Sequence, residues 1–175
     1  MHSLILLVAL AIASSFAAAQ SPYVGDQSRA IKSLSSDEVA DYLAGKGMGL
    51  AKAAELNGYP GPAHVLELAD RLDLTLPQRT ATEAVFAKMQ AEARAIGQRL
   101  VDEERALDRA FADRSVTPER LQAATASIAA LQGQLRDVHL RAHLAQARIL
   151  SGEQSVRYAV LRGYTNAAPV HRHAH

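Results

Sequence analysis

The residues best suited to chemistry in this chain are histidines, because the sequence contains seven of them and no cysteine. His139 and His143 are four residues apart, so in a helix both rings lie on one face and can bind one metal ion. The hydrolase pattern HExxH is absent, since Leu140 and Arg141 stand between them and supply no general base. The pair therefore indicates either a metal site or two histidines that border a core stripe on a solvated surface.

A second group of histidines alternates along the C-terminal end of the sequence: His171, His173 and His175. Alternate histidines on a disordered segment can wrap a Zn, Cu or Ni ion without any prepared geometry. We predict a His-rich disordered tail of this kind over residues 165–175, and an inert polar terminus is the alternative.

Composition favours helices as the scaffold for these residues. Aromatic residues make up only 5% of the chain, whereas alanine and leucine dominate residues 37–162. A formal net charge of +1 gives no reason to expect a nucleic-acid partner. The sequence also lacks a nucleophile elbow, a phosphate loop and paired catalytic carboxylates, so we do not expect an enzyme.

The N-terminal residues predict export. A short apolar run over residues 3–13 leads to three small residues, 17–19, which is typical of a secretory signal peptide over residues 1–19 with cleavage before Gln20. The run is too short for a membrane anchor, which needs about 20 apolar residues. Residues 20–34 contain scattered serine, proline and glycine without periodicity, and we expect a flexible arm there.

Residues 35–164 predict a single all-α domain. Ser35 and Glu38 have the spacing of a capping box, in which each side chain bonds the other's backbone amide. Gly97 is the weak point of the first long helix, because glycine lowers helix stability. Start and stop signals of this kind place the helices at about residues 35–44, 51–56, 62–72, 76–112, 118–149 and 152–161.

The helix expected over residues 118–149 carries the clearest periodic signal. Its apolar residues alternate steps of three and four over about four heptads, which forms an a/d seam. A short turn at residues 113–115 joins it to the preceding long helix, so the two must form an antiparallel hairpin. The fold class is therefore all-α, a long antiparallel helical hairpin with shorter flanking helices. The seam residues are Leu121, Ala124, Ile128, Leu131, Leu135, Val138, Ala142, Ala145 and Ile149.

The hairpin brings the candidate ligands together. A turn near Ser115 pairs the end of the second long helix with the start of the first. If the helix over residues 62–72 folds back on this pair, His64 reaches the same end of the hairpin. Glu67 lies one turn after His64, where an ordinary surface contact is the alternative. Imidazole donors favour Zn, Ni, Cu or Co, and we predict a divalent transition-metal site of His64, His139 and His143 with Glu67 or Glu83 as the oxygen ligand.

Two copies of one short motif bracket the hairpin. Leu74-Thr75-x-x-Gln78 precedes the first long helix, and Leu150-Ser151-x-x-Gln154 follows the second. The pair resembles the LTxxQ motifs of the periplasmic Spy/CpxP family and of the related heavy-metal sensor and resistance proteins of the CnrX and ZraP type. Ser151 replaces the threonine of the second copy, a conservative change for a helix cap. The resemblance covers about residues 62–164.

This resemblance implies a hooked, all-helical, dimeric protein of the periplasm with a role in stress. That role is either heavy-metal sensing or resistance, which would use the histidines, or an ATP-independent holdase chaperone that needs no metal. In CnrX-like sensors the ligands come from a histidine helix before the hairpin and from a histidine-containing turn late in it, whereas this chain has the single His64 before its hairpin. The implied partners are a second copy of the chain, unfolded periplasmic proteins or a membrane signalling partner.

Overall fold

The computed structural model describes residues 21–165 of the chain. The predicted signal peptide and the tail histidines His171, His173 and His175 lie outside the described residues. Within residues 21–165, no helix is both long enough and apolar enough to cross a membrane.

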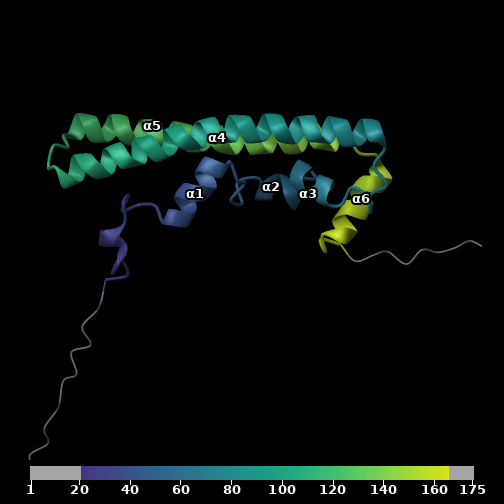
Figure 1. Ribbon diagram of the computed structural model, residues 1–175, viewed down its shortest axis with the longest axis horizontal. Coiled ribbons are helices and arrows are strands. Elements are labelled where there is room, and N and C mark those ends of the chain that lie inside the picture. The colour runs from purple at the N-terminus through teal and green to yellow at the C-terminus, as the bar shows by residue number, and fades with distance from the viewer. Residues whose placement is uncertain (1–20, 166–175) are drawn as a thin grey trace, which may run out of the picture.

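The architecture is an all-helical hairpin with short helices along one side (Figure 1). The two long helices, α4 (Leu76–Ala112) and α5 (Pro118–Ala147), run antiparallel. The short helices α1 (Ser36–Ala44), α2 (Lys52–Glu55) and α3 (Pro62–Glu67) follow one another along the hairpin toward its open end, where α6 (Gly152–Leu161) packs. A 3₁₀ turn, η1 (Asp26–Ser28), precedes α1, and the described residues contain no strand. The predicted fold class is confirmed.

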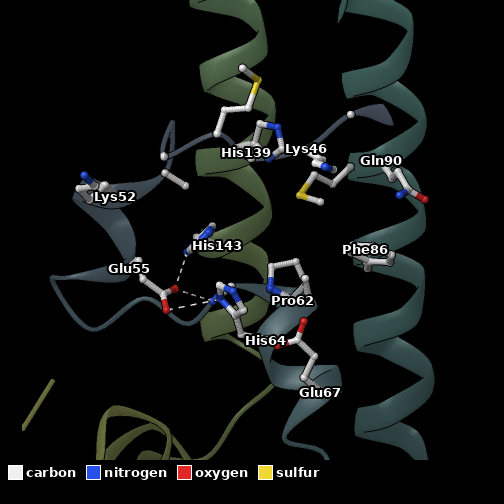
Figure 2. A pocket seen from close by; sticks show the side chains of 18 of the residues that line it. Lys46, Lys52, Glu55, Pro62, His64, Glu67, Phe86, Gln90, His139 and His143 are labelled. Carbon is white, nitrogen blue, oxygen red and sulfur yellow. Dashed lines mark hydrogen bonds and ion pairs between the residues drawn. The ribbon is translucent and has the colours of Figure 1, made fainter. Parts of the chain in front are cut away.

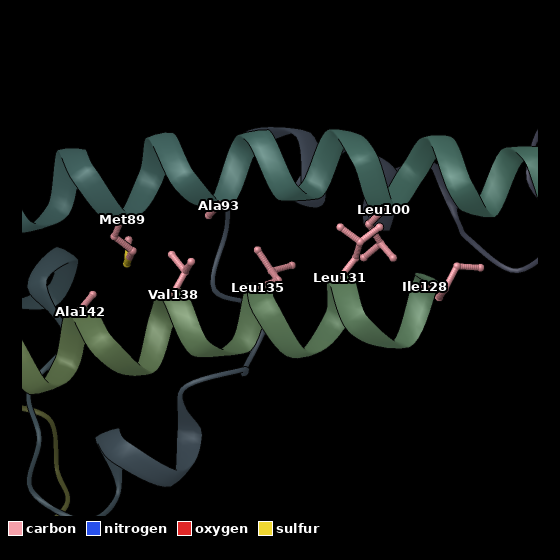
Figure 3. Packing of buried hydrophobic residues seen from close by; sticks show 8 residues of the cluster. All are labelled: Met89, Ala93, Leu100, Ile128, Leu131, Leu135, Val138 and Ala142. Atoms are coloured by element: carbon pink, nitrogen blue, oxygen red, sulfur yellow. The ribbon is translucent and has the colours of Figure 1, made fainter. Parts of the chain in front are cut away.

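The core of the hairpin lies between α4 and α5 (Figure 3). The central part of the predicted seam is buried, whereas Leu121 near the turn is 37% exposed because nothing covers the hairpin tip there. Near the open end, the Gln146 amide donates to the Thr82 hydroxyl at 3.1 Å, and both side chains are fully buried. The core cluster consists of Met89, Ala93, Leu100, Ile128, Leu131, Leu135, Val138 and Ala142.

The starts of α1, α4, α5 and α6 are fixed by side-chain caps, as the sequence predicts. Ser35, Thr75 and Ser151 each accept a hydrogen bond from the backbone amide three residues later and form complete capping boxes. Thr117 caps α5 by accepting from the Arg120 amide. Each such cap contributes about 1 kcal/mol to helix stability.

The segment before α1 differs from the flexible arm expected over residues 20–34. Ile31 and Leu34 are buried against Val101 of α4, and a turn bond from the Leu34 amide to the Ile31 carbonyl holds them side by side. The Lys32 amide and ammonium both donate to Asp108. Two apolar residues spaced three apart are enough to anchor this segment, although they give no periodic signal.

Gly97 is a helix-crossing point, which the sequence did not reveal. A Cβ atom placed on Gly97 would lie 2.2 Å from the carbonyl oxygen of Tyr42 in α1, so only glycine allows the two backbones to approach this closely. The helix expected over residues 62–72 is also shorter than predicted. It ends at Glu67, and turns continue the chain through Leu72, whose buried side chain packs with Val65.

Candidate functional site

The three predicted histidines line one cavity of about 850 Å³, here called the histidine cleft. It lies between the α1–α3 segment and the long helices, near the open end of the hairpin (Figure 2). His64 comes from α3, whereas His139 and His143 come from successive turns of α5. The predicted convergence of these residues is therefore what the structure shows.

A carboxylate that the sequence analysis did not nominate, Glu55 of α2, lies at the centre of the charged end of the cleft. Its Oε1 atom accepts hydrogen bonds from the hydroxyls of Tyr158 and Tyr164. Its Oε2 atom accepts from the Gly61 amide at 3.1 Å. Arg162 approaches Oε1 at 3.4 Å. Glu55 thus joins α2 to α6 and to the residues that follow α6.

His64 of α3 and His143 of α5 both face this carboxylate (Figure 2). The Nδ1 atom of His64 is 3.6 Å from Glu55 Oε1, and that of His143 is 3.7 Å from Glu55 Oε2. His143 Nδ1 also lies 2.7 Å from the carbonyl oxygen of Tyr59. A carbonyl only accepts, so Nδ1 donates this bond, and in the neutral ring Nε2 keeps its lone pair.

His139 is the most buried of the three histidines, with 3% of its surface exposed. Burial, and secondarily the neighbouring His143, lowers the pKa of its imidazole, so the ring is neutral at neutral pH. Its Nε2 atom is buried and has no hydrogen-bond partner. Figure 2 shows His139 one helical turn from His143, on the side away from Glu55.

Neither of the two acids nominated from the sequence takes the place of Glu55, which faces both His64 and His143. Glu67 lines the cleft but is exposed, and Glu83 is exposed on α4 and is not among the residues that line the cleft. Glu67 is suggested by its place one helical turn after His64, and Glu83 by the hairpin register, which puts it opposite α5. Glu55 has no such signal, because it approaches from a four-residue helix whose position only the tertiary structure fixes. Its one sequence signal is that it stands alone as an acid among apolar residues.

The donors are gathered but not arranged around one point. Among residues 21–165, no three side chains of His, Asp or Glu are placed so that they could hold one ion as they stand. One pair is nevertheless spaced like ligands. Two ligands of a tetrahedral zinc ion lie about 3.4 Å apart, and His64 Nδ1 is 3.6 Å from Glu55 Oε1. In His143, Nδ1 donates to the Tyr59 carbonyl, so its ligand atom would be Nε2. The residues therefore fit a metal ion in donor type, and the side chains must move to close the set.

The two motif glutamines meet at the open end of the hairpin. Each side-chain amide donates to the other's oxygen, Gln78 to Gln154 at 2.8 Å and Gln154 to Gln78 at 3.0 Å. Gln78 also donates to the Ile149 carbonyl, and Gln154 to the Leu72 carbonyl. The motifs therefore cap two helices and tie the ends of the hairpin together.

No protein-family model, curated protein or solved structure matches this chain. The paired motifs and their mutual contact are thus the observations that bear on its family.

Proposed function

We propose that this protein is an exported, non-enzymatic Spy/CpxP-like stress protein that binds a divalent transition metal in the histidine cleft, for heavy-metal sensing or resistance. The observation that carries the proposal is the pair of imidazoles, His64 and His143, that face the carboxylate of Glu55 at 3.6 and 3.7 Å. These side chains come from three separate helices. Nitrogen donors with one carboxylate suit Zn, Ni, Cu or Co better than Mg or Ca.

Metal binding at Glu55 would change the contacts of α6. The carboxylate now accepts from Tyr158 of α6 and from Tyr164 just after it. An ion bound to the same oxygens would compete with these two hydroxyls, so occupation would loosen the C-terminal helix from α2. A movement of α6 is the kind of response that a sensor could pass to a membrane signalling partner.

The paired LTxxQ-type motifs support the family and, with the apolar N-terminal residues 1–19, the periplasmic location. The reciprocal bonds between Gln78 and Gln154 give the motifs a joint structural role rather than two independent caps. A homodimer belongs to the same proposal, because a thin hairpin with covering helices on one side leaves its other long face open to a second copy.

Equilibrium binding of Zn and Ni to the full chain tests the proposal, with His171, His173 and His175 replaced by alanine so that the tail does not contribute. Glu55→Gln keeps the size of the side chain and removes its charge, and we expect it to weaken binding by about tenfold or more. Glu83→Gln is the matched control, because Glu83 is exposed outside the cleft. Equal affinities for the two variants would contradict the proposal.

A second function, holdase chaperone activity without metal, is favoured by exposed apolar side chains in and beside the cleft. Leu56 is 59% exposed and Tyr59 is 41% exposed, and the cleft itself is lined by Phe86, Met89 and Pro62. Contiguous exposed apolar surface marks binding sites for other proteins. The assay is suppression of the aggregation of an unfolded protein, measured by light scattering with a chelator present. Suppression should fall for Leu56→Ser. It should not fall for Leu144→Ser, which removes an exposed leucine of α5 outside the cleft. Equal activity of both variants would argue against this function.

A further inference from the structure

A second set of metal donors lies at the end of the histidine cleft away from Glu55. The chain has three methionines, and the two that the structure describes, Met48 and Met89, both line this cleft together with His139. Figure 2 draws the sulfur atoms at the His139 end of the cleft. The acids that line the cleft, Glu55 and Glu67, are labelled at the other end. The donors near His139 are therefore all neutral.

His139 supplies the imidazole of this set. The side chain is 97% buried and lines the cleft, yet its Nε2 atom has no hydrogen-bond partner. Buried polar atoms are almost always paired, so an orphaned one calls for a ligand or another specific explanation. Among the described residues, no carboxylate is hydrogen-bonded to this ring and so none favours its protonated form.

Met48 lies in an unusual loop that packs on His139 through Gly47. The residue lies between two glycines in the connection from α1 to α2 and has a φ of 44°, a left-handed conformation that residues with long side chains rarely adopt. Its neighbour Gly47 packs on the imidazole, because a Cβ atom there would lie 3.9 Å from His139 Nδ1. Backbone strain of this kind is concentrated at ligand-binding sites.

Met89 approaches from the opposite helix. It belongs to the core cluster on α4 and packs beside Val138 and Ala142, the residues of α5 that flank His139 on the same face (Figure 3). Met48, from the loop between α1 and α2, and Met89, from the hairpin core, thus line the same cleft as His139.

We propose that Met48, Met89 and His139 form a binding site for monovalent copper. Thioether sulfur is a soft, uncharged donor that selects Cu(I) over Zn, Ni or Co, and a neutral imidazole completes a set suited to this ion. The site shares the cleft with the divalent site but none of its ligands. Binding takes up Cu(I) as supplied and includes no electron transfer.

Competition with a chromogenic Cu(I) chelator under anaerobic, reducing conditions tests this site in the full chain that carries alanine in place of His171, His173 and His175. Met48→Leu and Met89→Leu conserve side-chain volume, so both variants should keep the fold. We expect each to weaken Cu(I) binding by about tenfold or more while Zn binding stays unchanged. Glu55→Gln should show the reverse pattern. A loss of less than tenfold in both methionine variants overturns the copper site.

X-ray absorption at the copper edge provides a readout that does not depend on the variants. We expect sulfur neighbours of copper in the chain that carries only the three tail replacements. A spectrum with only nitrogen and oxygen neighbours overturns the proposal. The two proposals also fail separately. Zn binding without Cu(I) binding removes the copper site alone, and Cu(I) binding without Zn or Ni binding removes the divalent site alone.

Discussion

Replacement of Gly97 by alanine tests how α1 packs on the hairpin. The added Cβ would lie 2.2 Å from the Tyr42 carbonyl oxygen and 2.8 Å from its carbonyl carbon, both of them backbone atoms that cannot rotate away. The carbonyl must retreat by about 1 Å before the contact reaches an ordinary C···O distance. Overpacking of this kind costs about 1–3 kcal/mol. Alanine regains up to about 1 kcal/mol as the better helix former, so we expect a net loss of up to about 2 kcal/mol.

Gly133→Ala in α5 is the matched control, because nothing lies within 4 Å of its added Cβ atom. This variant receives only the helix-propensity gain of about 0.5–1 kcal/mol. Urea unfolding followed by circular dichroism measures both, and the difference between the two variants isolates the packing cost at the α1–α4 crossing. If Gly97→Ala stabilised the protein as much as Gly133→Ala does, α1 would not cross α4 at this residue.

Three further predictions concern the core, the motifs and acid stability. Leu131→Ala, at a position that is 2% exposed, should lower the free energy of unfolding by about 2–5 kcal/mol. Leu144→Ala, at a 49% exposed position, should lower it far less, and equal losses would mean that the seam is misplaced. Gln78→Ala should cost about 1–3 kcal/mol, because it removes both bonds to Gln154 and the bond to the Ile149 carbonyl. Exposed Gln122→Ala, its control, should be nearly neutral in the same urea titration. The lowered pKa of His139 means that protons bind the unfolded chain more tightly than the folded one, so the stability that the neutral ring contributes should be complete above about pH 6.5 and fall below it. His139→Leu should reduce this loss of stability in acid. An unchanged loss would contradict the burial of a neutral ring.

The sequence predicted those parts of the fold that local rules determine. Caps at Ser35, Thr75 and Ser151, each followed by a matching residue three positions later, placed the helix starts, and the three-four spacing of α5 identified its buried face. The short turn between α4 and α5 then required a hairpin. These signals are local, so a single sequence is enough to predict them.

The parts that it could not predict depend on contacts between distant segments. Gly97 looked like a weak point because propensity scales contain no term for a crossing helix, and Ile31 and Leu34 looked unstructured because two residues show no period. Glu55 is the clearest case. The hairpin register correctly brought His64 and His143 together, but the carboxylate between them comes from α2, whose position no local pattern determines.

The central claim, that His64 and His143 bind a divalent metal together with Glu55, is tested most directly by nitrogen NMR of the histidine rings. The full chain is labelled with ¹⁵N-histidine and titrated with Zn at neutral pH, and the ring signals are assigned by single His→Ala substitutions. The account predicts that the ring nitrogens of His64 and His143 shift together at one equivalent of metal and that Glu55→Gln abolishes this shift. Shifts confined to His171, His173 and His175, with His64 and His143 unchanged, would contradict it.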